Sequence, residues 1–253
     1  MEEQQLRFSG LPWFPKPETK ISITIGGAGG IGSWAAFFLS RIGYDINIFD
    51  FDTIEQHNLG GQLYSKNSIG QLKVEGLLNT LRNFSNEDSL NTYSVPIDDN
   101  FRCITPYVIS AFDNMRARKN LFESALNLDY LNQSEEMQQN IEANGVLDTS
   151  IYSVSDYPLF IDGRLEAEQL QIFCVRLNNQ EDIEKYRETL FNDNEAEDAP
   201  CSFKQTSHNA ALIGSLITGV FTNHITNVVE GEDIRTVPFK TELYVPFMHL
   251  NLE

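Results

Sequence analysis

The sequence predicts an α/β fold with a mostly parallel sheet, helices on both faces and a mixed C-terminal extension. Three observations indicate this class. Short β-rich runs alternate with runs of helical length between residues 21 and about 128. The first run leads through a glycine-rich turn directly into a helix, and a βαβα order of this kind forms parallel strands with right-handed crossovers. With 253 residues, 41% of them hydrophobic, the chain can bury one full core.

The regular part of the chain contains four expected strands and three expected helices. The strands are expected at 21–25, 45–50, 91–95 and 107–112. The helices are expected at 30–42, 71–84 and 115–128. The second strand alternates polar and apolar residues, which is typical of a pleated strand with one buried face.

The pattern changes after residue 128. Two strands, beginning at Tyr157 and Gln169, are interpreted as running antiparallel to the rest. A helix at about 180–191, a long buried helix at 205–228 and a final strand or hairpin within 236–250 complete the regular structure. We interpret residues 1–253 as one domain with three irregular parts: an N-terminal arm (1–20), an amide-rich insertion (130–156) and an acidic crossover loop (192–204).

The composition excludes several classes of function. A net charge of −18, from 36 acidic and 18 basic residues, argues against a nucleic-acid partner. The three cysteines form no CxxC pair, so neither a disulfide framework nor a structural zinc site is expected. The polar N-terminus is no secretory signal, and the apolar run 210–221 is shorter than the ~20 residues of a membrane helix. We therefore expect a cytoplasmic protein that binds neither membrane nor nucleic acid.

A glycine loop follows the first strand. It contains Gly27, Gly29, Gly30 and Gly32 and is closed by Ser33, where the helix is expected. Glycines allow a sharp turn and a close approach of phosphates, and the helix N-terminus offers unpaired N–H groups to an anion. The pattern predicts nucleotide binding in a Rossmann-like domain. It does not distinguish NAD, FAD and ATP, and a tight turn without a ligand is the structural alternative.

A second group of polar residues favours a phosphate-cleaving site. Asp50 ends the second strand, where an acidic residue holds ribose hydroxyls in dinucleotide folds, and Asp52 follows it. Asn58, Gln62 and Lys73 come next, and they supply donors and a cation of the kind that a triphosphate needs. His57 is a weaker candidate beside the phosphates. Taken alone, Lys73 has the alternative interpretation of a surface charge.

Asp113 follows the strand at 107–112 and is a candidate magnesium ligand. A carboxylate at the carboxyl end of a parallel strand faces the ligand crevice, and Mg²⁺ is usually held by one or two carboxylates and phosphate oxygens. The alternative is that Asp113 caps the next helix. Arg118 either orients Asp113 from that helix or lies on the surface.

The series GxGGxGS, DxD, HNLxxQ, GxxK and DNxxxR resembles the adenylating superfamily of ThiF, MoeB and the ubiquitin-activating enzymes, over about residues 20–128. The resemblance implies a homodimer that uses MgATP to adenylate the C-terminal glycine of a ubiquitin-like or sulfur-carrier protein. It implies an ATP loop, a ribose contact at Asp50, phosphate contacts at Asn58, Gln62 and Lys73, and Mg²⁺ at Asp113. Lys73 and Asp113 would be the catalytic pair.

The chain departs from the family pattern at Gly61. The family usually has an arginine there that contacts phosphate, and its loss lowers the rate by ~10³ or more if no other cation replaces it. Arg7 of the arm is one candidate replacement, and a surface role is the other interpretation. The cysteine pairs that bind zinc in many relatives are missing as well.

Cys201 is the candidate nucleophile, because some family members transfer the acyl group to a cysteine in a crossover loop. The expected helix after it and Lys204 would lower the pKa of its thiol, whereas the preceding acidic residues act in the opposite sense. Cys103 and Cys174 are interpreted as inert.

Three rival functions stay open. An NAD(P)-dependent oxidoreductase would share the glycine loop and Asp50. It would leave five residues unexplained: Asp52, Asn58, Gln62, Lys73 and Asp113. A non-catalytic ATP-binding relative, acting as a binding module, is supported by Gly61. An adenylating enzyme directed at a peptide or a tRNA is the third, and the negative charge disfavours the tRNA.

Overall fold

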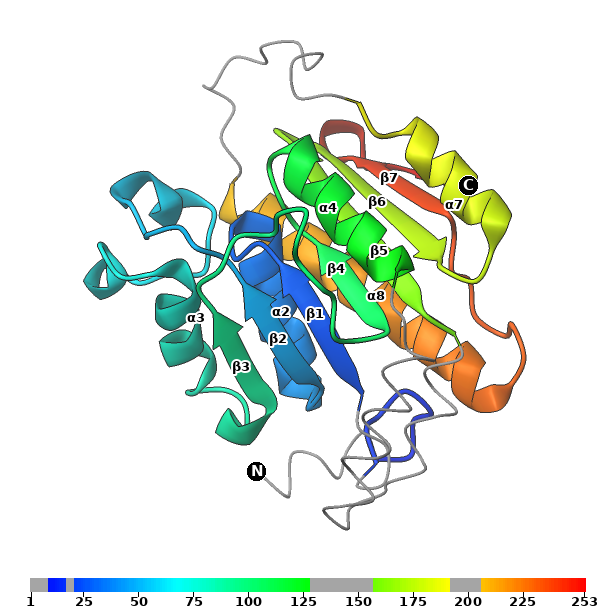
Figure 1. Ribbon diagram of the computed structural model, residues 1–253, viewed down its shortest axis with the longest axis horizontal. Coiled ribbons are helices and arrows are strands. Elements are labelled where there is room, and N and C mark those ends of the chain that lie inside the picture. Colours follow the sequence, from blue (N-terminus) through cyan, green and yellow to red (C-terminus); the bar gives the residue numbers. More distant parts are fainter. Residues whose placement is uncertain (1–8, 17–20, 128–156, 192–205) are drawn as a thin grey trace.

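The computed structural model describes residues 9–16, 21–127, 157–191 and 206–253 (Figure 1). Its core is one eight-stranded sheet with the strand order β3-β2-β1-β4-β5-β6-β7-β8. The strands are β1 (Ser22–Gly26), β2 (Asp45–Phe49), β3 (Leu90–Tyr93), β4 (Tyr107–Ser110), β5 (Leu159–Glu166), β6 (Gln169–Arg176), β7 (Lys240–Tyr244) and β8 (His249–Leu252). The α-helices are α2 (Gly30–Ile42), α3 (Lys73–Leu81), α4 (Met115–Leu126), α7 (Gln180–Glu188) and α8 (Ser207–Glu230). Short 3-10 turns are η1 (Gln56–Gly60), η2 (Lys66–Ser68), η3 (Glu87–Ser89) and η6 (Val245–Phe247).

The sheet confirms the predicted α/β class and corrects one strand direction. Strands β3, β2, β1, β4 and β5 are parallel neighbours, and β6, β7 and β8 follow in antiparallel order. The strand beginning near Tyr157 was expected to be antiparallel, but β5 pairs in parallel with β4. The chain between β4 and β5 is long enough for a parallel crossover. The reversal comes one step later, in the two-residue turn after β5, where Ala167 has a φ of 50°.

Two hydrophobic cores lie on the two faces of the sheet. Alternate strand residues such as Ile23, Ile25 and Ile109 face α2, α3 and α8. On the other face, Val108 and Phe160 pack with α4 and α7. Figure 1 shows α2 and α8 behind the sheet and α4 and α7 in front of it. This is the two-faced covering that the sequence predicted.

Helix α3 is shorter than the predicted 71–84. Leu72 is still extended, with φ −60° and ψ 140°, and the adjoining segment forms an isolated β-bridge between Thr53 and Leu72. Helix α2 has its predicted bounds, 30–42, and ends on Gly43 in the left-handed region at φ 104°. The tail forms the hairpin β7–β8. The interpreted insertion and crossover loop fall outside the described residues.

Helix α8 is the one described helix that is long and apolar enough to cross a membrane, with a mean hydropathy of 1.3 over an 18-residue window. Half of that window is buried inside the protein. The helix packs along α2, and Gly214 makes this possible, because a Cβ there would lie 2.9 Å from the backbone nitrogen of Ala35. Ile213, Ile217 and Phe221 of this helix belong to the core that faces α2 and the sheet.

Candidate functional site

Three loops meet where the parallel strands β1, β2 and β4 end. The amide of Gly27 donates to the carbonyl of Phe49 at 2.8 Å, and the amide of Ala111 donates to Gly26 at 2.8 Å. The carboxylate of Asp50 accepts from the amide of Ala28 at 2.7 Å. The glycine loop is thus fixed on one side by the end of β2 and on the other by the end of β4. This is the crevice in which α/β sheets bind ligands.

The loop glycines divide into two groups. Gly27 has a φ of 94°, and a Cβ there would lie 2.8 Å from the carbonyl oxygen of Ala111. A Cβ at Gly32 would lie 1.8 Å from the carbonyl oxygen of Gly27. Both glycines are required by the fold itself. Gly29 is not, because its φ is −73° and the nearest atom to a Cβ there would be Nε2 of Gln62 at 3.9 Å.

Gly29 is also the N-cap of α2, and no side chain caps this helix. The first amides of a helix have no intrahelical acceptor, so the start of α2 offers N–H groups to an anion. Gly30, the first helical residue, is buried in this turn. A nucleotide phosphate therefore fits the geometry of the loop, and close approach of a ligand would explain a glycine at position 29.

Ser33 holds the glycine loop to the segment after η1. Its hydroxyl donates to the carbonyl of Gly30 at 3.2 Å and accepts from the amide of Leu63 at 3.1 Å, and its own amide donates to Gly29. All its polar groups are thus engaged within the protein. A nucleotide contact, which the sequence predicted for Ser33, would have to compete with these bonds.

Tyr64 also holds the glycine loop in place, which the sequence did not indicate. Its hydroxyl donates to the carbonyl of Ala28 at 2.5 Å. Burial raises the pKa of the Tyr64 hydroxyl well above its usual range, and the charges of Asp50 and Asp52 add to this. The hydroxyl thus stays protonated and keeps donating to the loop.

Asp50, Asp52 and Lys73 form an ion cluster beside the loop. The ammonium of Lys73 lies 2.7 Å from Oδ2 of Asp52 and 4.0 Å from Oδ2 of Asp50. Asp50 is buried, and its second oxygen accepts from the amide of Asp52 at 2.9 Å. Burial raises the pKa of the Asp50 carboxyl, and the charge of Lys73 opposes this. The Lys73 side chain is 11% exposed, whereas that of Asp52 is 53% exposed.

Asn58 and Gln62 differ in how their amides are used. Oδ1 of Asn58 accepts from the amide of Glu55 at 2.7 Å in a capping box that starts η1. Oε1 of Gln62 is buried and has no hydrogen-bond partner among the described residues. A buried amide atom without a partner costs free energy unless a ligand satisfies it. His57, the weaker candidate, is exposed and lies 3.2 Å from Glu55.

Gly61 takes the place of the family arginine. Its carbonyl accepts from the indole of Trp34 at 3.1 Å, and the residue is buried. The indole thus fixes the backbone at this position. Arg7, the candidate replacement cation, and Cys201, the candidate nucleophile, both lie outside the described residues.

Asp113 is exposed on the loop after β4. The cap of α4 is Asn114, whose side chain accepts from the amide of Ala117 at 2.9 Å, so Asp113 is not the cap. The described residues contain no group of three acidic, cysteine or histidine side chains that could hold a metal. A metal at Asp113 would thus depend on one carboxylate and on phosphate oxygens, which is how Mg²⁺ is commonly held.

Arg118 makes no direct hydrogen bond to the carboxylate of Asp113, and it is not a surface residue. It is buried on α4 and forms an ion pair with Asp162 at the end of β5. It also donates to the carbonyl of Phe112 and, at 3.0 Å, to that of Gly163. The pairing of Arg118 with Asp162 could not be predicted from the spacing of the two residues in the sequence.

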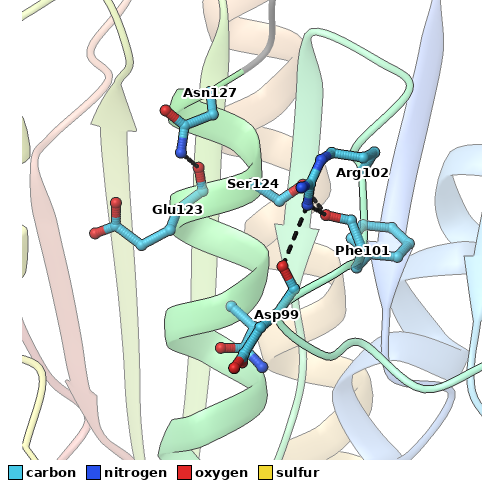
Figure 2. Close-up of a pocket in the computed structure, with 7 residues that line it drawn as sticks. Asp99, Phe101, Arg102, Glu123, Ser124 and Asn127 are labelled. Atoms are coloured by element: carbon cyan, nitrogen blue, oxygen red, sulfur yellow. Dashed lines mark hydrogen bonds between the residues drawn. The ribbon is translucent and has the colours of Figure 1, made fainter.

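A hollow of about 390 Å³ lies away from these loops. Figure 2 shows it between α4 and the segment that precedes β4. The guanidinium of Arg102 donates to the carbonyls of Asp99 and Phe101 there, at 3.2 and 2.8 Å. The hollow borders the C-terminal half of α4. It therefore lies at the opposite edge of the sheet from the glycine loop. None of the predicted site residues lines it.

The two described cysteines are buried. Burial raises the pKa of the Cys103 thiol and raises that of Cys174 to about 12. Thiols in this state are poor nucleophiles at neutral pH. The structure agrees with their interpretation as inert.

The sequence profile of the ThiF family matches residues 18–154. Among curated proteins, the chain is 34% identical over 77 residues to ubiquitin-like modifier-activating enzyme 5 of Oryza sativa, which covers 30% of this chain and 18% of the relative. It is 30% identical over 105 residues to adenylyltransferase and sulfurtransferase MOCS3 of Anopheles gambiae, covering 39% and 24%. The chain thus spans less than a third of the length of these two relatives.

Solved structures share the fold over nearly the whole chain. Escherichia coli MccB with ATP superposes with a TM-score of 0.61 at 15% identity, covering 92% of this chain and 63% of that one. PaaA gives a TM-score of 0.65 at 15% identity, covering 100% and 71%. At this identity the likeness concerns the fold alone.

Proposed function

The chain belongs to the ThiF family, and from this we propose that it uses MgATP to adenylate the C-terminal carboxylate of a small protein. The acceptor that we propose is a ubiquitin-like or sulfur-carrier protein ending in glycine. The matched regions of the modifier-activating and adenylyltransferase relatives support this class of chemistry.

The reaction is an in-line transfer. A carboxylate oxygen of the acceptor attacks the α-phosphorus, the bond to the bridging oxygen breaks, and pyrophosphate leaves with the electron pair. The start of α2 and Gln62 would hold the phosphates, and Lys73 would neutralise charge that shifts towards the leaving group. Asp113 would hold Mg²⁺. Positioning and charge neutralisation supply most of the acceleration in such reactions.

The observation that carries the proposal is the combination of Gly29 with the unpartnered amide of Gln62. The fold does not need a glycine at position 29, and the nearest neighbour of a Cβ there would be the Gln62 amide. That amide keeps one buried atom without a hydrogen bond among the described residues. A phosphate seated on the amides of α2 accounts for the glycine and would face the Nε2 donor of Gln62. The unpartnered Oε1 is an acceptor, so it calls for a donor on the ligand, such as a hydroxyl or amino group of the nucleotide.

We propose three further properties on the same basis. The protein acts as a homodimer, in which Arg7 of the arm replaces the missing arginine at Gly61. Cys201 receives the acyl group as a thioester after adenylation. The protein acts in the cytoplasm and needs neither membrane nor nucleic acid.

Pyrophosphate exchange into ATP tests the main proposal. The acceptor to use is a small ubiquitin-like or sulfur-carrier protein that ends in Gly-Gly. We expect exchange that requires this acceptor and is lost in Lys73→Met. Titrations of the purified protein with ATP, NAD and NADP distinguish the proposed enzyme, which should bind ATP, from an oxidoreductase, which should bind a nicotinamide nucleotide. If a Cys201→Ala variant still formed every acceptor conjugate, the proposed thioester step would be wrong.

A binding module that keeps ATP without turnover is the second candidate, and Gly61 favours it. ATP binding without acceptor-dependent exchange would support this candidate against the enzyme. A Gly61→Arg variant sharpens the test. Its φ of −133° lies outside the left-handed region that only glycine adopts readily. A gain of exchange in this variant would point to a weakened enzyme.

A further inference from the structure

A buried cluster of two guanidinium groups and one carboxylate lies next to the loop that carries Asp113. Asp162 is fully buried at the carboxyl end of the parallel part of β5, where it pairs in register with Ser110. One of its oxygens meets Arg118. The other accepts from Nε of Arg164 at 2.7 Å.

Arg118 connects this cluster to the loop after β4. One nitrogen, Nη1, contacts Asp162 and the carbonyl of Gly163, while Nη2 donates to the carbonyl of Phe112. Phe112 immediately precedes Asp113. A single planar side chain thus spans from the end of β5 to the peptide unit that joins Phe112 to Asp113.

The other guanidinium faces away from that loop. Arg164 donates to the carbonyl and the hydroxyl of Thr189, at 3.2 and 2.9 Å, and lies 4.5 Å from the ring centre of Phe173. Asp162 is therefore held from the α7 side by Arg164, and it holds Arg118 in turn. Thr189 thus fixes Arg164, Arg164 fixes Asp162, and Asp162 fixes Arg118.

Stability alone does not explain such a cluster. Buried ion pairs are often replaceable by apolar residues without loss of stability, since desolvation offsets their attraction. What a guanidinium supplies is a rigid fork with fixed donor directions, which a lysine cannot reproduce. Here the guanidinium of Arg118 donates to the backbone carbonyl of Phe112, which directly precedes the candidate metal ligand Asp113.

We propose that Arg118, held by Asp162, is a positioning residue that fixes the Phe112–Asp113 peptide so that the Asp113 carboxylate meets the metal of bound MgATP. The inference rests on the proposed function for its ligand. It assigns Arg118 no contact with substrate.

The test compares ATP affinity with Mg²⁺ and with EDTA in four proteins: wild type, Arg118→Lys, Asp113→Asn and the double variant. We expect Arg118→Lys to weaken binding about tenfold in Mg²⁺, the range for residues that support metal ligands, and to leave binding in EDTA unchanged. The loss should vanish in the Asp113→Asn background, because coupled residues are not additive. An equal loss in both media, no loss, or additivity with Asp113→Asn would overturn the proposal.

Arg176→Lys is the matched control, because Arg176 makes a two-bond pair with Asp182 on α7, at 2.6 and 2.9 Å. It should leave both affinities unchanged. If Arg118→Lys does not fold, Asp162→Asn replaces it, since the amide keeps an acceptor for Arg118 but loses the charge.

Hydrogen exchange of the free protein gives a readout that needs no nucleotide. We expect the Arg118 variant to raise amide exchange at residues 112–117, including the Ala117 amide that donates to Asn114. Outside this loop, changes should be confined to the vicinity of its other partners, Asp162 and Gly163. Unchanged exchange there would overturn the positioning role. If the wild type binds no MgATP, the proposed function fails, and exchange alone decides whether Arg118 fixes the loop.

Discussion

The two ion clusters at the carboxyl edge of the sheet are built differently. Beside the glycine loop, Lys73 pairs with Asp52, whose side chain is 53% exposed. Beneath the loop of Asp113, Asp162 is fully buried and is bound by two guanidinium groups. In the first cluster, the cation has a partner that is half-exposed to solvent. The second has its carboxylate bound on both oxygens, which suits it to hold backbone in place.

The largest expected effect is on the free energy of unfolding, which should depend far more on the Asp162 cluster than on the Asp52 cluster. Asp162→Ala would leave two guanidinium groups without their buried counter-charge, and such a change costs about 3–5 kcal/mol. Asp52→Ala removes a half-exposed partner and should cost less than about 1 kcal/mol. Urea denaturation of both variants measures the difference. Similar losses in the two would show that the clusters do not differ in kind.

The next effect concerns activity, because only the cluster beside the glycine loop is expected to contact the nucleotide. Lys73→Met should reduce acceptor-dependent exchange by about 10²–10³, the range for removal of one transition-state contact, with a stable fold. Lys66→Met, at an exposed lysine in η2, is the control and should exchange like the wild type. Were Lys73→Met to retain full exchange, Asp52 would be the permanent partner of Lys73 and the cluster merely structural.

A smaller pair of effects concerns the glycine loop between the clusters. Gly32→Ala should destabilise the fold by about 1–3 kcal/mol or more, because its methyl group would overlap the carbonyl of Gly27. Gly29→Ala should change the free energy of unfolding by less than about 1 kcal/mol and still weaken ATP binding. Thermal unfolding and ATP titration of both variants give the comparison. Unaltered ATP affinity in Gly29→Ala would remove the phosphate from the start of α2.

The smallest effect lies far from both clusters, at His224 on α8. It is buried and donates to the carbonyl of Tyr157 at 2.9 Å, and burial lowers the pKa of its imidazole below 6.5. The unfolded chain therefore binds a proton first as the pH falls below about 6.5, and stability decreases until the folded pKa is reached. Urea midpoints at pH 7.5 and 5.5 should differ less in His224→Gln than in the wild type, with the exposed His249→Gln as control. Equal pH dependence in all three would refute this.

Local patterns predicted the part of the fold that local chemistry determines. The strand, glycine turn and helix from 21 to 42 were predicted almost to the residue, because the turn glycines and the αL cap at Gly43 act on their neighbours. Lys73 was correctly expected at the start of a helix, although that helix is shorter.

What the sequence could not predict depends on pairing between distant segments. Arg118 and Asp162 are 44 positions apart and meet only because β4 and β5 pair in parallel. The direction of β5 was itself misjudged, so its partner could not be foreseen. Ser33 fits the nucleotide motif by position, yet its hydroxyl is engaged by the amide of Leu63, 30 positions away. Predicted nucleotide roles for Gly29, Gln62, Lys73 and Asp113 remain predictions.

At Gly214, helix α8 packs closely against the middle of α2. A methyl group on residue 214 of α8 would have no space against Ala35, which is the sixth of the 13 residues of α2. Close packing of this kind resists displacement of α2 when an anion binds at its first turn. Binding would then meet a preorganised seat, and little of the attraction would be lost to reshaping the protein.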